Sequence, residues 1–273
     1  MADQSVNLSS ATRTNLLALQ NTTSLISRTQ ERLSTGLKVN SAIDDAIAFF
    51  QARSLSDRAS DLTVLKDSID QGVSSVETAV AGIEAIADIV EQMKGIALGA
   101  KSDANVENRS KSAVQFNDLR LQLDNLANDS SYKGTNLVKG SPANLKVTFS
   151  EDGSSTLTIS GVSSDSSGLS ITVAASNWAA DGNIDTAIND LDSALSTLRS
   201  TASTMGSSAS VLSLRLDFTT QLVNSLEEGA AKFVNADLNT ESANLLTLQT
   251  RQQLGTIGLS IAQQSEQSIL RLF

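Results

Sequence analysis

The sequence predicts a mainly α-helical protein: a long antiparallel coiled-coil bundle with a small β-hairpin region, plus a two-helix terminal coiled-coil domain. In two long segments, apolar residues recur at alternating steps of four and three, the spacing of a coiled-coil seam. The chain has 273 residues but only one proline, Pro142, so little interrupts its helices. Aromatic residues make up only 3% of the chain, which suits thin helical seams better than a globular core.

The longest seam runs from Ile184 to Phe233. Its spacing predicts one continuous helix, although a run of small residues around Gly206 favours close approach of a neighbouring helix there. We expect the helix to end near residues 235–240, where Asp237, Asn239 and Thr240 can cap the next one. The seam residues are Ile184, Ile188, Leu191, Leu195, Leu198, Ala202, Met205, Ala209, Leu212, Leu216, Thr219, Val223, Leu226, Ala230 and Phe233.

Two earlier segments repeat this spacing and can pack against the long seam as an antiparallel bundle. One is a helix expected over residues 46–100, and the other a shorter helix over 103–128. The apolar residues of the first are Leu62, Leu65, Ile69, Val73, Val76, Val80, Ile83, Ala87, Val90 and Ala97. Those of the second are Phe116, Leu119, Leu123 and Leu126.

Residues 130–182 change character, because serine and glycine become common and the apolar period drops to two. This alternation predicts a small β region of about three strands. Asp152 and Gly153 lie between the first two strands and fit a hairpin turn. Trp178 closes the region, and we interpret it as a packing residue. The alternating residues are Leu145, Val147 and Phe149, then Leu157 and Ile159, then Leu169, Ile171 and Val173.

The two ends of the chain are helical arms with apolar residues on more than one face. A pair of helices cannot cover so many faces, so we expect arms that are poorly ordered in a monomer and become buried on self-association. In the C-terminal arm, Leu245, Leu248, Leu259, Ala262 and Ile269 form one stripe, separate from a second. The residues expected to drive self-assembly are Leu16, Leu19, Ile26, Leu33, Leu37, Leu246, Leu254, Ile257, Ile261, Ile269 and Leu272.

A short polar segment follows the N-terminal arm. Gly36 and Asn40 are helix stop signals. Ser41 fits the N-cap of the next helix, with Asp44 in its first turn, and Asp44 and Asp45 are interpreted as capping residues. A metal site is the alternative, but adjacent carboxylates point in different directions on a helix and no third ligand is evident.

Composition excludes several classes of function. The net charge is -10 and there is no basic run, which argues against nucleic acid and anionic membrane surfaces as partners. The chain has no cysteine and no histidine, so thiol and imidazole catalysis and the usual zinc ligands are absent. No cofactor site is evident. The N-terminus lacks the features of a cleavable secretion signal, and no apolar run is long enough to span a membrane.

Residues 32–46, with the sequence RLSTGLKVNSAIDDA, resemble the N-terminal signature of bacterial flagellins. The C-terminal arm resembles theirs as well, at residues 252–256 and 262–272. The resemblance implies three segments: residues 1–40 and 237–273 as arms of an inner coiled-coil domain, and 41–236 as a rod. Only about 50 residues separate the second rod helix from the long seam helix, so the chain resembles a short flagellin without large outer domains.

The resemblance implies a structural subunit that self-assembles into the flagellar filament for motility. Such a subunit is not an enzyme, needs no cofactor, and leaves the cell unfolded through the flagellar type III apparatus. Its partners would be further copies of itself, an export chaperone on the C-terminal arm, and the filament cap and junction proteins. A hook–filament junction protein, a secreted coiled-coil adhesin or surface-coating protein, and a flagellin with an inserted protease domain are the alternatives. An inserted metalloprotease domain would need a histidine motif, and this chain has no histidine.

The sequence departs from the flagellin pattern in two places. Many flagellins continue the signature with small residues, where this chain has Ala46-Ile47-Ala48-Phe49-Phe50. The second departure lies in the segment that many flagellins use to bind a Toll-like innate receptor. The receptor-active pattern has charged residues where this chain has glutamine or glycine, so we expect weak receptor binding. The matching residues are Gln92, Lys94, Gly95, Ile96 and, in the next helix, Gln115.

Overall fold

The computed structural model describes residues 10–270, and the chain divides into two compact units. The terminal unit comprises Met1–Asp57 and Leu226–Phe273, and the rod unit comprises Arg58–Ser225. Two long helices, α2 (Ala46–Ser102) and α4 (Asp181–Val234), contribute residues to both units. No helix in the described part of the chain is long and apolar enough to cross a membrane.

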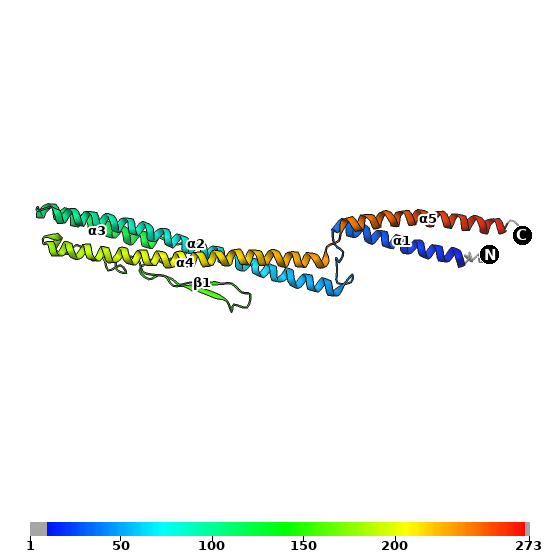
Figure 1. The fold of residues 1–273 in the computed structure, drawn as a ribbon, viewed down its shortest axis with the longest axis horizontal. Helices are drawn as coiled ribbons and strands as arrows, with labels where there is room; N and C mark the ends of the chain where they lie inside the picture. The colour runs from blue at the N-terminus through cyan, green and yellow to red at the C-terminus, as the bar shows by residue number, and fades with distance from the viewer. Residues whose placement is uncertain (1–9, 271–273) are drawn as a thin grey trace, which may run out of the picture. The chain divides into compact units, whose positions relative to one another are not determined.

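The terminal unit is built on the two arms. Helix α1 (Ser10–Thr35) packs against α5 (Leu238–Leu270), and Figure 1 shows them side by side in blue and red. Close approach is possible because α5 carries a glycine at the contact: a Cβ on Gly255 would lie 2.8 Å from Leu19 Cδ1. The pair confirms the predicted helical arms.

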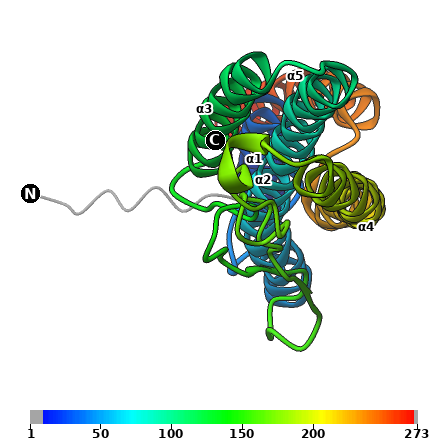
Figure 2. The same ribbon diagram turned by 90° about the vertical axis from the view of Figure 1, so that its left-hand side faces the viewer.

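The rod unit is a three-helix bundle of α2, α3 (Val106–Asp129) and α4, seen nearly end-on in Figure 2. One contiguous apolar core runs between the helices. Most of the heptad residues predicted on α2 and α4 are buried, as are apolar residues of α3, as expected when three apolar stripes face one another. Fully buried examples are Ile69, Ile83, Val90, Phe116, Leu123, Ile184, Leu191, Leu198 and Leu212.

The long helix predicted from the seam is confirmed as α4, but two details of the prediction are wrong. Helix α4 is continuous through Gly206, as predicted, but no neighbouring atom comes within 4 Å of a Cβ placed on Gly206, so the expected close helix approach is absent there. At the other end, Phe233 is exposed, and the buried seam stops at Ala230. The close approach occurs instead on α2, where a Cβ on Gly82 would collide with the side chain of Ser130.

The middle of the chain contains a two-stranded antiparallel hairpin. Strand β1 (Leu145–Thr148) pairs with β2 (Thr156–Ile159), in the register Leu145 to Ile159 and Val147 to Leu157. Gly153 takes a φ of +71° in the connecting turn, which glycine adopts without steric cost. The predicted hairpin is therefore confirmed.

The third predicted strand, at residues 169–173, is wrong. Side chains of α3 bind the backbone that a strand would have used for pairing: Arg120 Nε donates to the Ile171 carbonyl at 3.1 Å, and the Ala174 N–H donates to Asn117 Oδ1 at 3.0 Å. Leu169 and Ile171 are still buried in the rod core. The alternating apolar residues thus indicated burial correctly, but the backbone partners belong to a helix. Trp178 is fully buried against Phe116, with ring centroids 5.0 Å apart, which confirms its packing role.

Candidate functional site

The segment that joins α1 to α2 is tied to the segment that joins α4 to α5. Helix α1 ends with Gly36 at a φ of +72°, and the Gly36 N–H donates to the Arg32 carbonyl at 2.9 Å. The Lys38 N–H then donates to the Val234 carbonyl at 2.7 Å, and the Ala236 N–H donates to the Gly36 carbonyl at 2.9 Å. These backbone hydrogen bonds join the two connecting segments side by side. We call the joined segments the terminal crossing (residues 36–39 and 234–236).

Asp44 organises the turn that follows the crossing. Its carboxylate accepts hydrogen bonds from the Ser41 hydroxyl at 3.1 Å, the Ser41 N–H at 3.0 Å and the Asn40 N–H at 3.2 Å. These bonds, the Ser41 hydroxyl first, favour the charged form and lower the pKa of Asp44. The turn therefore holds a carboxylate that stays ionised below its ordinary range.

Asp45, and not Ser41, caps helix α2. The Asp45 carboxylate accepts from the Ala48 N–H at 3.0 Å, and its carbonyl accepts from the Phe49 N–H at 3.0 Å. The prediction that Ser41 is the N-cap is wrong, because residues 41–44 form a separate turn before the helix begins. Capping by Asp45 is confirmed, whereas Asp44, which was also predicted to cap the helix, closes the preceding turn instead.

The C-terminal arm is anchored in two ways. The Asp237 carboxylate accepts from the Thr240 hydroxyl at 2.8 Å and from the N–H groups of Asn239 and Thr240, which lowers the pKa of Asp237 and caps α5. Four residues later, Glu241 is buried and pairs with Arg32 of α1 at 2.9 Å. The ion pair joins the two arms close to the terminal crossing.

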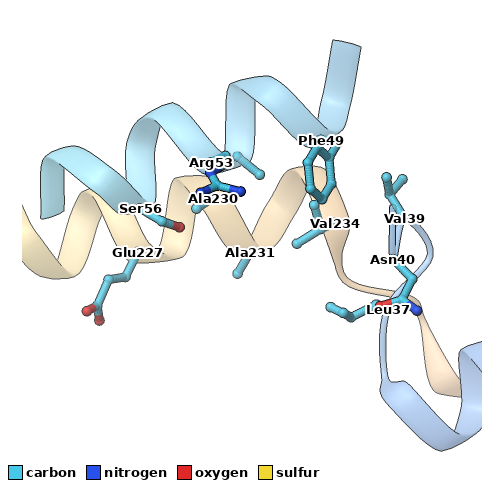
Figure 3. A pocket seen from close by; sticks show the side chains of 11 residues that line it. Leu37, Val39, Asn40, Phe49, Arg53, Ser56, Glu227, Ala230, Ala231 and Val234 are labelled. Carbon is cyan, nitrogen blue, oxygen red and sulfur yellow. The ribbon is translucent and has the colours of Figure 1, made fainter. Parts of the chain in front are cut away.

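A groove with a volume of about 470 Å³ lies beside the terminal crossing (Figure 3). Its lining is mostly apolar and comes from the crossing, the first turns of α2 and the last turns of α4. Arg53 and Glu227 are its charged lining residues. We call it the terminal groove, with apolar walls formed by Leu37, Val39, Phe49, Ala52, Ala231 and Val234.

The arm residues predicted for self-assembly fall into two groups. On α1, Ile26 is buried, Leu19 and Leu33 are half-buried and Leu16 is exposed, while Leu37 in the terminal crossing is half-buried. On α5, the stripe with Leu245, Leu248, Leu259 and Ala262 is half-buried. The second stripe is exposed, and we call it the α5 outer face: Leu246, Leu254, Ile257 and Ile261. Leu272 and the side chain of Ile269 lie outside what the structure describes.

The segment matching the receptor site lies on the rod unit. Gln92, Gly95 and, on α3, Gln115 are exposed. Lys94 pairs with Asp192 of α4 at 2.5 Å, and Ile96 packs against the rod core. Gln92, Gly95 and Gln115 are therefore solvent-accessible, while Lys94 and Ile96 serve the bundle.

Sequence reasoning missed three elements of the terminal unit. The pairing of Arg32 with Glu241 joins residues 209 positions apart, so no local pattern could reveal it. Val39 is buried in the terminal crossing, although its polar neighbours gave no apolar period. Gly255 did carry a signal, because a glycine inside a helical pattern often marks close approach of another backbone or side chain.

The described residues include no cluster of three acidic, histidine or cysteine side chains arranged to hold a metal ion. Asp44 and Asp45 bind backbone groups with their carboxylates instead. What this region offers chemically is apolar surface with a few fixed charges, which suits binding between macromolecules.

Two family profiles match this chain, one in its N-terminal part and one in its C-terminal part. The profile of the bacterial flagellin N-terminal helical region matches residues 6–143, and that of the C-terminal helical region matches residues 183–273. Flagellin FljM and flagellin FljK of Caulobacter vibrioides are each 34% identical to this chain over 281 residues, covering all of both proteins. A flagellin of Brucella melitensis is 30% identical, over 98% of this chain and 99% of its own length.

Among solved structures, a crystal structure of Bacillus cereus flagellin matches 56% of this chain and 88% of its own, at 18% identity and a TM-score of 0.49. The two family profiles and the full-length relatives point to the same family as the sequence signature at residues 32–46. This chain belongs to the bacterial flagellin family.

Proposed function

We propose that this flagellin is a filament subunit whose terminal arms supply most of the contacts between copies. The observation that carries the proposal is the α5 outer face, four large apolar side chains that stay exposed after α1 and α5 have paired. Burying one such side chain completely contributes about 1.5–3 kcal/mol, and a monomer forgoes this contribution. Contiguous exposed apolar surface of this kind marks a binding face.

The arms at residues 1–40 and 237–273 would then form the inner coiled-coil layer of the polymer, and residues 41–236 the layer outside it. A filament needs a heterologous contact, in which one surface of a subunit meets a different surface of the next, so that the assembly does not close. Several faces of the arms carry apolar residues, so one arm pair can contact more than one neighbour.

Assembly of purified protein tests this proposal. The full chain is seeded with sheared filament ends and examined by negative-stain electron microscopy, beside a truncated chain lacking residues 1–37 and 241–273. We expect long filaments from the full chain alone. A full chain that stays monomeric under these conditions would contradict the proposal and favour the junction-protein alternative.

A matched pair of variants places the driving force more finely. Leu254→Ser with Ile257→Ser removes the centre of the α5 outer face, and Val64→Ser removes an equally exposed apolar residue from the rod unit. We expect the first variant to lose assembly and the second to retain it. Equal behaviour of the two would show that exposure alone, and not the α5 outer face, governs polymerisation.

The same apolar face makes the C-terminal arm a suitable target for an export chaperone before assembly. We propose that the chain leaves the cell unfolded through the flagellar type III apparatus, and that it assembles outside the cell with the cap and junction proteins as neighbours. The variant Leu254→Ser with Ile257→Ser should bind the flagellin chaperone more weakly than Val64→Ser does. Equal affinities measured by calorimetry would contradict a role of the α5 outer face in chaperone binding.

Weak activation of the Toll-like innate receptor is proposed for the rod unit. Gln92 and Gly95 are exposed where receptor-active flagellins carry charged residues, so charge-assisted hydrogen bonds worth about 1.5–3 kcal/mol each are missing. Gln92→Arg with Gly95→Glu should raise potency in a reporter-cell assay. Full potency of the unaltered chain would contradict the proposal, and Gln92 would then be explained by filament contacts.

A further inference from the structure

Three large apolar side chains project into solvent where helix α2 begins. Ile43 is 97% exposed, Ile47 73% and Phe50 61%. Ile47 and Phe50 are three positions apart on α2 and share one side of the helix, while Ile43 lies in the turn fixed by Asp44. We call these three residues the α2 knob.

Ile47, in the middle of the α2 knob, points away from the terminal groove. At about 100° per residue, Ile47 points about 160° away from Phe49 and about 180° away from Ser56, which both line the groove. Phe50 lies between the two sides, with its ring edge-to-face against Phe49 and centroids 5.6 Å apart. Ile47 of a subunit therefore cannot enter the terminal groove of the same subunit.

The charges beside the α2 knob and the terminal groove are complementary. Asp44 and Asp45 flank the knob and are exposed. Lys38 adjoins the groove walls in sequence, and Arg53 is part of the lining. Arg53 is only loosely engaged, because its contact with Asp57 is 3.8 Å long and both side chains are more than 60% exposed.

We propose that the α2 knob of one subunit docks into the terminal groove of a second copy of this chain, with Asp44 and Asp45 approaching Lys38 and Arg53. The inference rests on the proposed function, since it names a specific contact within the filament. Knob and groove lie on different sides of one helix, so the contact is heterologous and repeats from subunit to subunit. Glu227 also lines the groove and sets the preferred orientation by repelling the two aspartates.

Disulfide trapping tests the contact, because the chain has no cysteine of its own. Ile47→Cys places a thiol on the α2 knob, and Ala231→Cys places one in the terminal groove. Filaments of the double variant, oxidised after assembly, should yield a ladder of covalent multimers, and each single variant should stay monomeric on a denaturing gel. The matched control is Ile47→Cys with Lys232→Cys, which moves the second thiol to the exposed neighbouring position outside the groove.

Two further samples keep the outcomes distinct. If the double variant does not polymerise, wild-type subunits are copolymerised with the two single variants, and covalent dimers containing one of each are expected. Ile47→Ser with Phe50→Ser should raise the critical concentration about tenfold or more while leaving the circular dichroism of the monomer unchanged.

Filaments that form without any cross-link, together with an unchanged critical concentration for Ile47→Ser with Phe50→Ser, would overturn the docking contact and leave the proposed function intact. If the wild-type chain does not polymerise at all, the proposed function fails and the docking contact fails with it. Cross-linking of the Lys232→Cys control as efficient as that of the groove pair would also overturn the specific contact.

Discussion

The rod unit and the terminal unit use the same kind of sequence pattern with opposite results. In the rod unit, heptad residues such as Ile83 and Leu198 are fully buried, because three helices surround one core. In the terminal unit, Leu254 and Ile257 remain more than half exposed, although α1 and α5 pack against each other in the part of the chain that the structure describes. Apolar periodicity thus shows that a residue belongs to a helix interface, while the number of neighbouring helices decides whether one subunit can complete that interface.

The largest expected difference between the two units is the loss of stability when a large apolar side chain is truncated. Leu198→Ala should lower the free energy of unfolding of the rod unit by about 3 kcal/mol, because it leaves a cavity in a close-packed seam. Leu254→Ala should change monomer stability by less than about 0.5 kcal/mol, because its side chain is already in water. Urea unfolding followed by fluorescence of Trp178, the only tryptophan of the chain, measures the first effect, and circular dichroism measures the second. Equal losses in the two variants would contradict the comparison.

A smaller effect is expected at the ion pair between the arms. Arg32→Ala leaves the buried Glu241 without its partner, which should weaken the α1–α5 pair by about 2 kcal/mol. Hydrogen exchange of α5 amides should become faster, while the Trp178 unfolding midpoint stays unchanged. Arg53→Ala is the control, because the contact of Arg53 with Asp57 is long and exposed. A shift of the Trp178 midpoint in Arg32→Ala would show that the two units are not energetically separate.

The smallest predicted effect is a pH dependence confined to the aspartates that close turns or cap α5. Hydrogen bonds lower the pKa of Asp44 and Asp237 below 3.8 in the folded state, so the folded state binds fewer protons there than the unfolded state. Their contribution is complete above the unfolded pKa and is lost as the pH falls through the folded pKa. In the hairpin turn of the rod unit, bonds involving Ser150 and Ser154 lower the pKa of Asp152 to about 2, so it titrates at still lower pH.

Carboxyl titration followed by nuclear magnetic resonance checks this prediction. Asp44 should titrate below 3.8, and the fold of residues 36–45 should loosen only once Asp44 takes up a proton. In Asp44→Asn, the acid sensitivity of this turn should disappear. A pKa of Asp44 at or above 3.8 would show that the bonds from Ser41 do not persist in solution.

Much of the fold follows from the sequence alone. The buried seam from Ile184 to Ala230, the helices α2 and α3, the hairpin around Gly153 and the paired arms could all be predicted, because each rests on local spacing or turn chemistry. The capping role of Asp45 follows for the same reason.

The features that could not be predicted depend on contacts between residues far apart in the sequence or on competition between neighbouring caps. Residues 169–173 alternate like a strand, but Arg120 and Asn117 of α3 bind the backbone around them. The Arg32–Glu241 pair and the terminal groove exist only once the two ends of the chain have crossed. Ser41 was misassigned because Asp44 closes a turn of its own before the Asp45 cap.

Hydrogen exchange of the same protein as monomer and as filament tests the central claim most directly. We expect amides of the rod unit to be equally protected in both states, while those of α1 and α5 exchange quickly in the monomer and become protected in the filament. Arms protected in the monomer as strongly as the rod would show that the terminal unit completes its own interfaces. That result would contradict self-assembly driven by the arms.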